Sequence, residues 1–225
     1  MKLFVGIPCY DGKVFCDTVR SLLEEVGAAS ALGVEMQFCF IPGTCYIPLA
    51  RNRIVDAFLA SDADKLVFID ADVSWPVGSL LKLASHNVDC VAGIYRHKRD
   101  AETYPLVWPD ESGTAELNAV DGLLEARFVP GGFWCLTRAA FDTFRACHGP
   151  RPYSHEGNEG YAWFSNPYRP GVMWGEDSLF CEEYREAGGK VWVDPELSLT
   201  HTGGNPQFTG HLGDFLRGRI DGNAG

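Results

Sequence analysis

Two carboxylates follow a short apolar run at residues 67–72, which read VFIDAD. The run predicts a buried strand, so Asp70 and Asp72 stand at its carboxyl end, where open α/β sheets bind ligands. Because both residues lie past the strand, their side chains need not alternate between faces and can address one ion. Carboxylate oxygens suit Mg²⁺ and Mn²⁺, which keep positions open for substrate phosphates. The alternative is a plain turn, in which aspartate bonds the backbone.

A histidine near the end of the chain is a candidate third ligand. His201 follows a short apolar stretch and precedes Gly203 and Gly204, which allow close backbone approach. Neutral imidazole is a good ligand for Mn²⁺ in a mixed oxygen and nitrogen site. A lone histidine is more often structural, and this reading stays open.

Two further acidic residues, Glu176 and Asp177, stand at the start of a predicted helix. Acidic side chains are favoured there by the helix dipole, so an ordinary helix N-terminus explains them. The functional alternative is a carboxylate that acts as a general base on a hydroxyl group.

Basic residues occur at two places where they can meet an anion. Arg51, followed by Asn52, lies in the first turns of a predicted helix, and a planar guanidinium suits a phosphate or a base edge. Residues 95–99 (YRHKR) follow the fourth predicted strand and form the densest basic segment of the chain. Such a segment can hold a phosphate or an anionic acceptor. Solvated surface charge is the alternative at both places.

The elements that must position these residues alternate regularly in the first half of the chain. We expect strands at 3–7, 34–41, 65–69 and 89–94 and helices at 13–26, 48–61 and 76–86. Short connections between alternating strands and helices predict βαβ units and a parallel sheet. The predicted fold class is therefore α/β, with a mostly parallel, Rossmann-like central sheet and helices on both faces.

The pattern changes after residue 95 and predicts a mixed second half. We expect strands at 104–108, 123–129, 133–136 and 190–193 and helices at 138–147 and 176–187. Between them lies a long irregular stretch, 148–174. Its aromatic side chains either stack on sugar rings or pack the loop onto the body of the protein; they are Tyr153, Tyr161, Trp163, Phe164, Tyr168 and Trp174.

Composition limits the class of protein. The 225 residues carry 46% hydrophobic side chains and a formal charge of −11, so broad binding to nucleic acid is not expected. The eight cysteines form no CxxC pair and read as reduced thiols. The first residues carry too short an apolar run for a signal peptide, and no stretch is long enough for a membrane span. We therefore expect a cytoplasmic protein.

Taken in order, these segments resemble the GT-A glycosyltransferases, in particular the family 2-like branch. The resemblance rests on the segments GIPCYD at 6–11, ARN at 50–52, FIDAD at 68–72 (a DXD motif), GGF at 131–133, EDSLF at 176–180 and AGGKVW at 187–192, together with His201. Each motif is short, but their order along most of the chain is specific.

The resemblance implies one GT-A domain over 1–225, with a nucleotide-binding half (1–95), an acceptor half (96–205) and a C-terminal tail (206–225). It also implies the site residues. Pro8, Tyr10 and Asp11 would border the nucleotide, with Arg51, Asn52, Asp70 and Ala71 beside it; Asp70, Asp72 and His201 would hold Mn²⁺ or Mg²⁺; Asp177 and Glu176 would be catalytic. His211, in the tail, is a weaker candidate for the site.

Three functions are compatible with these residues. The first is a hexosyltransferase-like glycosyltransferase that uses a nucleoside-diphosphate sugar, with UDP-sugar as the expected donor. Its acceptor is left open among a saccharide, a lipid-linked sugar, a protein and a modified nucleobase. The second is a sugar-phosphate nucleotidyltransferase, although the usual glycine-rich basic loop is missing near the N-terminus. The third is a non-catalytic module that binds nucleotide or carbohydrate.

Overall fold

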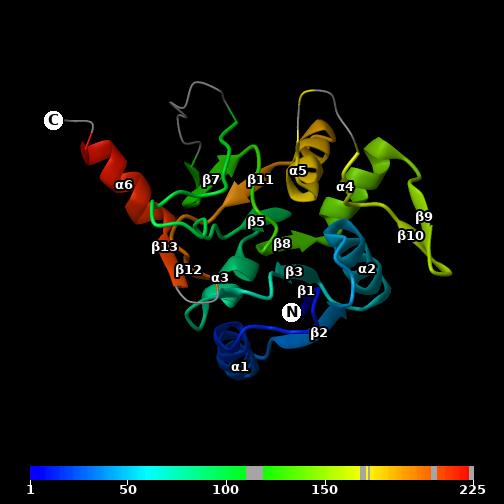
Figure 1. The fold of residues 1–225 in the computed structure, drawn as a ribbon, viewed down its shortest axis with the longest axis horizontal. Coiled ribbons are helices and arrows are strands. Elements are labelled where there is room, and N and C mark those ends of the chain that lie inside the picture. Colours follow the sequence, from blue (N-terminus) through cyan, green and yellow to red (C-terminus); the bar gives the residue numbers. More distant parts are fainter. Residues whose placement is uncertain (110–118, 168–170, 172, 204–206, 223–225) are drawn as a thin grey trace.

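The first half of the chain forms the expected alternation of strands and helices (Figure 1). The computed structural model describes residues 1–109, 119–167, 171, 173–203 and 207–222. The elements of the first half are β1 (Lys2–Cys9), α1 (Cys16–Ala31), β2 (Glu35–Pro42), α2 (Ile47–Ala60), β3 (Lys65–Ile69), β4 (Val73–Ser74), α3 (Ser79–Ser85) and β5 (Cys90–Ala92).

The elements of the second half are β6 (Ala119–Val120), β7 (Leu123–Ala126), β8 (Phe133–Thr137), α4 (Arg138–His148), β9 (Pro152–His155), β10 (Asn158–Tyr161), α5 (Glu176–Glu186), β11 (Val191–Val193), β12 (Ser198–Thr202), β13 (Gln207–His211) and α6 (Leu212–Gly222). The second half inserts β8 between β3 and β5 of the framework and adds β11, β7 and β6 beyond β5. In the part of the chain that the structure describes, no helix is both long and apolar enough to cross a bilayer.

Eight strands form the central sheet, in the order β2-β1-β3-β8-β5-β11-β7-β6. β1, β2 and β3 pair in parallel, and so do β5 and β11. β8 runs antiparallel to both β3 and β5, and β7 runs antiparallel to β11 and β6. Six of the eight strands therefore point in one direction, with β8 and β7 reversed, which confirms a mostly parallel sheet with a mixed second half.

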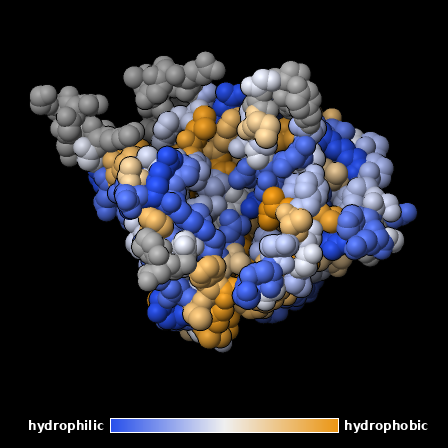
Figure 2. Space-filling model, viewed as in Figure 1, coloured by the Kyte–Doolittle hydropathy of each residue, from blue (hydrophilic) through white to orange (hydrophobic). Residues whose placement is uncertain are grey.

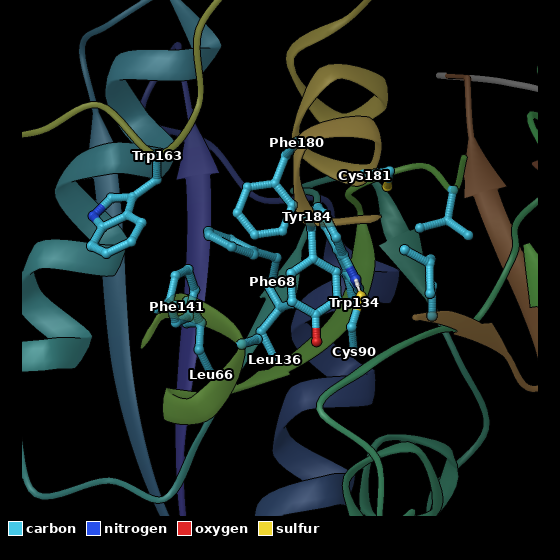
Figure 3. Close-up of a cluster of buried hydrophobic side chains, with 14 of the residues drawn as sticks. Leu66, Phe68, Cys90, Trp134, Leu136, Phe141, Trp163, Phe180, Cys181 and Tyr184 are labelled. Atoms are coloured by element: carbon cyan, nitrogen blue, oxygen red, sulfur yellow. Dashed lines mark hydrogen bonds between the residues drawn. The ribbon is translucent and has the colours of Figure 1, made fainter. Parts of the chain in front are cut away.

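Helices cover both faces of this sheet. The face toward α2, α4 and α5 carries an aromatic core in which Trp134 donates a hydrogen bond to the Cys90 sulfur (Figure 3). In the same core Phe180 stacks on Phe164 at 4.8 Å. The opposite face packs against α1 and α3 through mainly aliphatic side chains, together with aromatic ones such as Trp75 and Phe133. Buried contacts on both sides fix the sheet, so the loops at its carboxyl edge start from rigid strand ends.

Helix α1 buries only one narrow side. Leu22 and Ala29 enter the core, whereas Val19, Leu23 and Val26 are partly exposed at the i, i+4, i+7 spacing of one helix stripe. Figure 2 shows hydrophobic surface at the lower edge of the molecule, where Figure 1 places α1. The helix begins at Cys16 rather than at residue 13, which leaves residues 10–15 as a loop.

Two expectations for the second half are wrong or incomplete, and one segment, the C-terminal tail, carries no predicted element. No strand forms over 104–108, because Pro105 has no N–H to donate and only Val107 pairs, as an isolated bridge to Phe128. The stretch 148–174 is not wholly irregular, since β9 and β10 form a hairpin in it. The tail is also structured: β13 pairs with β12, and α6 follows.

Two aromatic side chains of 148–174 follow the packing alternative. Trp163 and Phe164 are each 1% exposed and belong to the core, so they pack the loop onto the body of the protein. Trp174 instead lies partly exposed, with its ring centroid 5.2 Å from that of Phe128. Tyr168 lies outside the described residues.

Candidate functional site

The two carboxylates of residues 67–72 lie in a tight turn at the carboxyl end of β3. The Val73 N–H donates to the Asp70 carbonyl at 3.1 Å, and the Asp70 N–H donates to the Gly132 carbonyl at 2.9 Å. The Ala71 carbonyl accepts from the Phe15 N–H at 2.9 Å and from the Thr18 hydroxyl at 3.2 Å. These bonds hold the turn from three sides and fix where its side chains point.

A small second sheet carries His201 to this turn from the end of the chain. β12 pairs with β4 so that His201 lies opposite Val73, and the Thr202 N–H donates to the Asp72 carbonyl at 2.8 Å. The His201 Nε2 atom consequently lies 3.6 Å from Asp72 Oδ1. The predicted convergence of Asp72 and His201 is therefore present in the structure.

The hydrogen bond on the other ring nitrogen sets the tautomer of His201. Its Nδ1 atom lies 3.0 Å from the Arg96 carbonyl, which only accepts, so Nδ1 carries the proton. In the neutral ring, Nε2 then presents a lone pair toward Asp72. A backbone carbonyl behind the imidazole is the usual support of a metal-binding histidine.

Asp70 lines the edge of the turn and is held on both of its carboxylate oxygens. The Tyr95 hydroxyl donates to Oδ2 at 3.1 Å, and Arg51 Nη2 donates to Oδ1 at 3.3 Å. Burial raises the pKa of Asp70, and the Arg51 charge opposes that rise. Burial also raises the pKa of Tyr95 far above its ordinary value, so its hydroxyl stays protonated and can donate. Asp70 is thus an anchored carboxylate rather than a freely oriented one.

Arg51 lies behind the turn and not on the surface. Only 3% of it is exposed, and its Nε atom lies 3.3 Å from Glu176 Oε1, an ion pair without hydrogen-bond alignment. Its guanidinium also lies over the Phe68 ring at 5.5 Å. Arg51 therefore joins Asp70 to Glu176 inside the protein, and the solvated alternative is wrong.

Asp72 is about as exposed as Asp70, with 24% of its side chain accessible against 26%, but in contrast to Asp70 it has a lowered pKa. Burial raises the pKa of this carboxyl, but His201 and Lys98 outweigh that effect, so the pKa lies below its ordinary value. The Lys98 ammonium contacts Asp72 Oδ2 directly. Asp72 is consequently ionised at neutral pH and is suited to bind a cation.

A pocket of about 630 Å³ opens in front of these residues. This volume is in the range of small-molecule sites. The lining residues come from the end of β1, the following loop, the turn after β3 and two distant positions; they are Pro8, Cys9, Tyr10, Asp11, Lys13, Val14, Phe15, Cys16, Asp70, Ala71, Asp72, Tyr95 and His201.

Most of the predicted site residues therefore line one pocket. Pro8, Tyr10 and Asp11 form one wall of it, and the residues of the turn form another. The stretch 13–16 also lines the pocket but was not predicted to do so, because its apolar spacing is typical of the first turn of a helix. Its position follows from the hydrogen bond of Phe15 to Ala71.

Four predicted residues lie outside this lining. Arg51 and Glu176 are paired behind it, and Asn52 is 5% exposed, with its side-chain amide bonded to the backbone of Phe164 in both directions. Asp177 lines a separate cavity of about 380 Å³, together with the strand-less stretch 104–107, the segment 128–130 and Ser178. The weaker candidate His211 lies elsewhere, 3.9 Å from Glu196.

The residues in the turn fit a cation that is shared with a ligand. Among the described residues, no group of three His, Cys, Asp or Glu side chains is arranged to hold a metal alone. Asp72 and His201 supply one oxygen and one nitrogen, and Asp70 is turned to Arg51 and Tyr95. Mg²⁺ and Mn²⁺ bind well through one or two protein ligands plus substrate phosphates. The donor set therefore fits such an ion.

Gly132 must be glycine for this arrangement, which yields a prediction. A Cβ there would lie 2.2 Å from Asp70 Oδ2 and 2.7 Å from the Tyr95 hydroxyl. Gly132→Ala is expected to displace Asp70 and to weaken nucleotide binding at least about tenfold, or about 1.4 kcal/mol. Gly27→Ala is the matched control, because a Cβ there meets nothing within 4 Å. Isothermal titration with UDP and Mn²⁺ compares the two; equal affinities would contradict the prediction.

Comparison with known proteins finds similarity at the level of the fold. No family model and no curated protein matches the sequence. Among solved structures, the chain is similar to protein A197 from STIV, with a TM-score of 0.53, 18% identity and coverage of 90% of this chain and 86% of that one.

Two glycosyltransferase structures are also similar. One is a mutant of Drosophila β1,4-galactosyltransferase 7 in complex with manganese, UDP-Gal and xylobiose (TM-score 0.50, 16% identity, 94% of this chain and 70% of that one). The other is GalNAc-T7 with UDP, GalNAc and Mn²⁺ (TM-score 0.51, 14% identity, 91% of this chain and 45% of that one). At these identities the likeness establishes a shared GT-A-like fold.

Proposed function

We propose that this chain is a metal-dependent glycosyltransferase that transfers a sugar from a nucleoside-diphosphate sugar, with UDP as the nucleotide, to an acceptor hydroxyl. One observation carries the proposal: His201 meets Asp72 at 3.6 Å on the rim of a 630 Å³ pocket at the carboxyl edge of the sheet. Two structures with this fold contain manganese and a uridine nucleotide, which adds support.

The residues divide into binding and positioning roles in this proposal. Pro8, Tyr10 and Asp11 border the nucleotide, and Asp72 and His201 hold Mn²⁺ or Mg²⁺. A divalent cation supplies positive charge that stabilises a departing diphosphate. Asp70 orients the ligand from its fixed position in the turn.

The acceptor is proposed to occupy the second cavity. Asp177 lines it beside Phe128 and Tyr104, so a carboxylate and two aromatic rings share a cavity that can hold a sugar ring. Its Oδ1 atom accepts the Ser178 N–H at 2.7 Å, which fixes the carboxylate at the start of α5. From there Asp177 removes the acceptor proton if the reaction inverts configuration, and orients the acceptor if it retains.

Glu176, by contrast, is proposed as a positioning residue. It is buried and lies against Arg51, on the side of the turn away from solvent. It connects the helix that carries Asp177 to the arginine that holds Asp70. Asp177 alone is therefore assigned the acid–base role.

A donor panel tests the function. The protein is incubated with UDP-sugars and GDP-sugars in Mn²⁺ or Mg²⁺, and released nucleoside diphosphate is measured with and without chelator. Release with one UDP-sugar, lost on chelation, is the expected result. Parallel reactions with UTP and a sugar phosphate measure pyrophosphate, whose release would instead identify a nucleotidyltransferase. If chelator does not change nucleotide binding and no donor is turned over, the protein is a non-catalytic binding module.

A further inference from the structure

Lys98 places an ammonium group beside the carboxylate proposed to bind the metal. It lies on the loop that follows β5, and its ammonium contacts Asp72 Oδ2 while His201 Nε2 lies 3.6 Å from Oδ1. Both oxygens of Asp72 thus face a basic group. The other carboxylate of the turn is neutralised differently, by the buried Arg51.

The backbone around Lys98 is fixed, although its side chain is not enclosed. Arg96 Nη2 donates to the Arg99 carbonyl at 2.9 Å and to the Asp100 carbonyl at 2.8 Å, and the His97 N–H donates to the Thr103 carbonyl at 2.9 Å. The Lys98 side chain remains 35% exposed. The ammonium can therefore leave Asp72 by rotation about its own side-chain bonds, without movement of the loop.

An ammonium and a divalent cation compete for Asp72. The metal needs a carboxylate oxygen at about 2.0–2.2 Å, and two positive charges on one carboxylate repel each other. An exposed ion pair is weak, because water and rotamer entropy oppose it. A divalent cation can therefore displace the lysine, and a metal-bound diphosphate gives the released ammonium a new anionic partner.

We propose that Lys98 is the resident counter-ion of Asp72: it neutralises this carboxylate when no metal is bound, is displaced by the divalent cation, and then contacts the diphosphate of the bound nucleotide. This inference rests on the proposed function. It predicts opposite effects of Lys98 on two affinities, because the lysine competes with the metal and assists the nucleotide.

The test measures both affinities by titration calorimetry. Lys98→Met is expected to bind Mn²⁺ alone about three- to tenfold more tightly than the wild type and to bind UDP in saturating Mn²⁺ about three- to tenfold more weakly. Lys98→Arg, which keeps the positive charge, should bind Mn²⁺ and UDP with affinities close to those of the wild type. Lys190→Met is the matched control, since this exposed lysine pairs with Glu125 away from the pocket. Thermal unfolding of each variant verifies that it is folded.

The remaining outcomes overturn the inference in separable ways. Suppose that Lys98→Met and the wild type bind Mn²⁺ equally, while Asp72→Ala does not bind it. Lys98 then does not compete with the cation, although Asp72 is still a metal ligand. If UDP binding requires Lys98 but not Mn²⁺, lysine replaces the metal instead of yielding to it. If neither protein binds Mn²⁺ without UDP, the inference is wrong. If neither binds it in the presence of UDP either, the metal dependence in the proposed function is wrong as well.

Discussion

Replacement of Asp72 by alanine is expected to lower the rate of sugar transfer at least about 1000-fold, because it removes the ionised ligand of the proposed cation. Asp72 is the carboxylate that faces His201 Nε2, and its pKa lies below the ordinary value. Once Asp72 is gone, His201 alone offers the cation one neutral nitrogen. The measurement is release of nucleoside diphosphate at saturating Mn²⁺, with Mn²⁺ affinity by calorimetry as a second readout.

A matched substitution separates this effect from a general loss of charge. Asp62→Ala removes an exposed aspartate that pairs with Lys2 away from the pocket, and it should leave transfer within about twofold of wild type. Asp72 also pairs with an exposed lysine, so Asp72→Ala should change the free energy of unfolding by about 1 kcal/mol or less. Full transfer by a folded Asp72→Ala protein would refute the role assigned to this residue.

The parts of the site that follow from local sequence could be predicted. The apolar run 65–69 is the same strand in the structure, and this places Asp70 and Asp72 at a strand end. The alternation of strands and helices up to residue 95 has its own local signals of apolar spacing, proline and glycine. The fold class and one half of the candidate site therefore come from short-range patterns.

The parts that depend on pairing between distant strands could not be predicted in detail. His201 reaches the turn because β12 pairs with β4, a two-residue strand that has too little pattern to recognise. The β9–β10 hairpin and the packing of β13 on β12 likewise depend on contacts outside their own segments. Such pairing is decided by packing and register rather than by propensity.

The position of Arg51 shows a second limit of sequence reasoning. From sequence alone, an arginine in the first turns of a helix is expected either to be exposed to solvent or to contact the nucleotide. In the structure, two glycines make room for it: a Cβ on Gly131 would lie 1.4 Å from Arg51 Nη1. The pair Gly131–Gly132 therefore admits a buried guanidinium on one side and Asp70 on the other, which no local pattern around residue 51 reveals.

Arg51→Met should lower the free energy of unfolding by about 3–5 kcal/mol, because it leaves the carboxylates of Asp70 and Glu176 without their shared partner. Urea unfolding at pH 7.5 measures the change. The control is Arg20→Met, since Arg20 is exposed and pairs with Asp17 one helical turn away; a change within about 0.5 kcal/mol is expected there.

The pH dependence of the Arg51→Met deficit identifies its cause. Burial raises the pKa of Glu176, and Arg51 opposes that rise. A carboxyl whose pKa is higher in the folded state binds its proton more tightly there, so stability falls as pH rises from the unfolded pKa to the folded one. Without Arg51 the folded pKa rises further, and this window extends toward neutral pH. The deficit should therefore be smaller at pH 5 than at pH 7.5.

A second substitution in the same background distinguishes lost pairing from lost packing. Glu176→Gln removes a buried negative charge, so the double variant with Arg51→Met should recover part of the deficit at pH 7.5 and lose most of its pH dependence. A cavity left by the shorter side chain would give the same deficit at both pH values and no recovery. An Arg51→Met protein as stable as the wild type would show that the buried arginine does not hold these carboxylates in place.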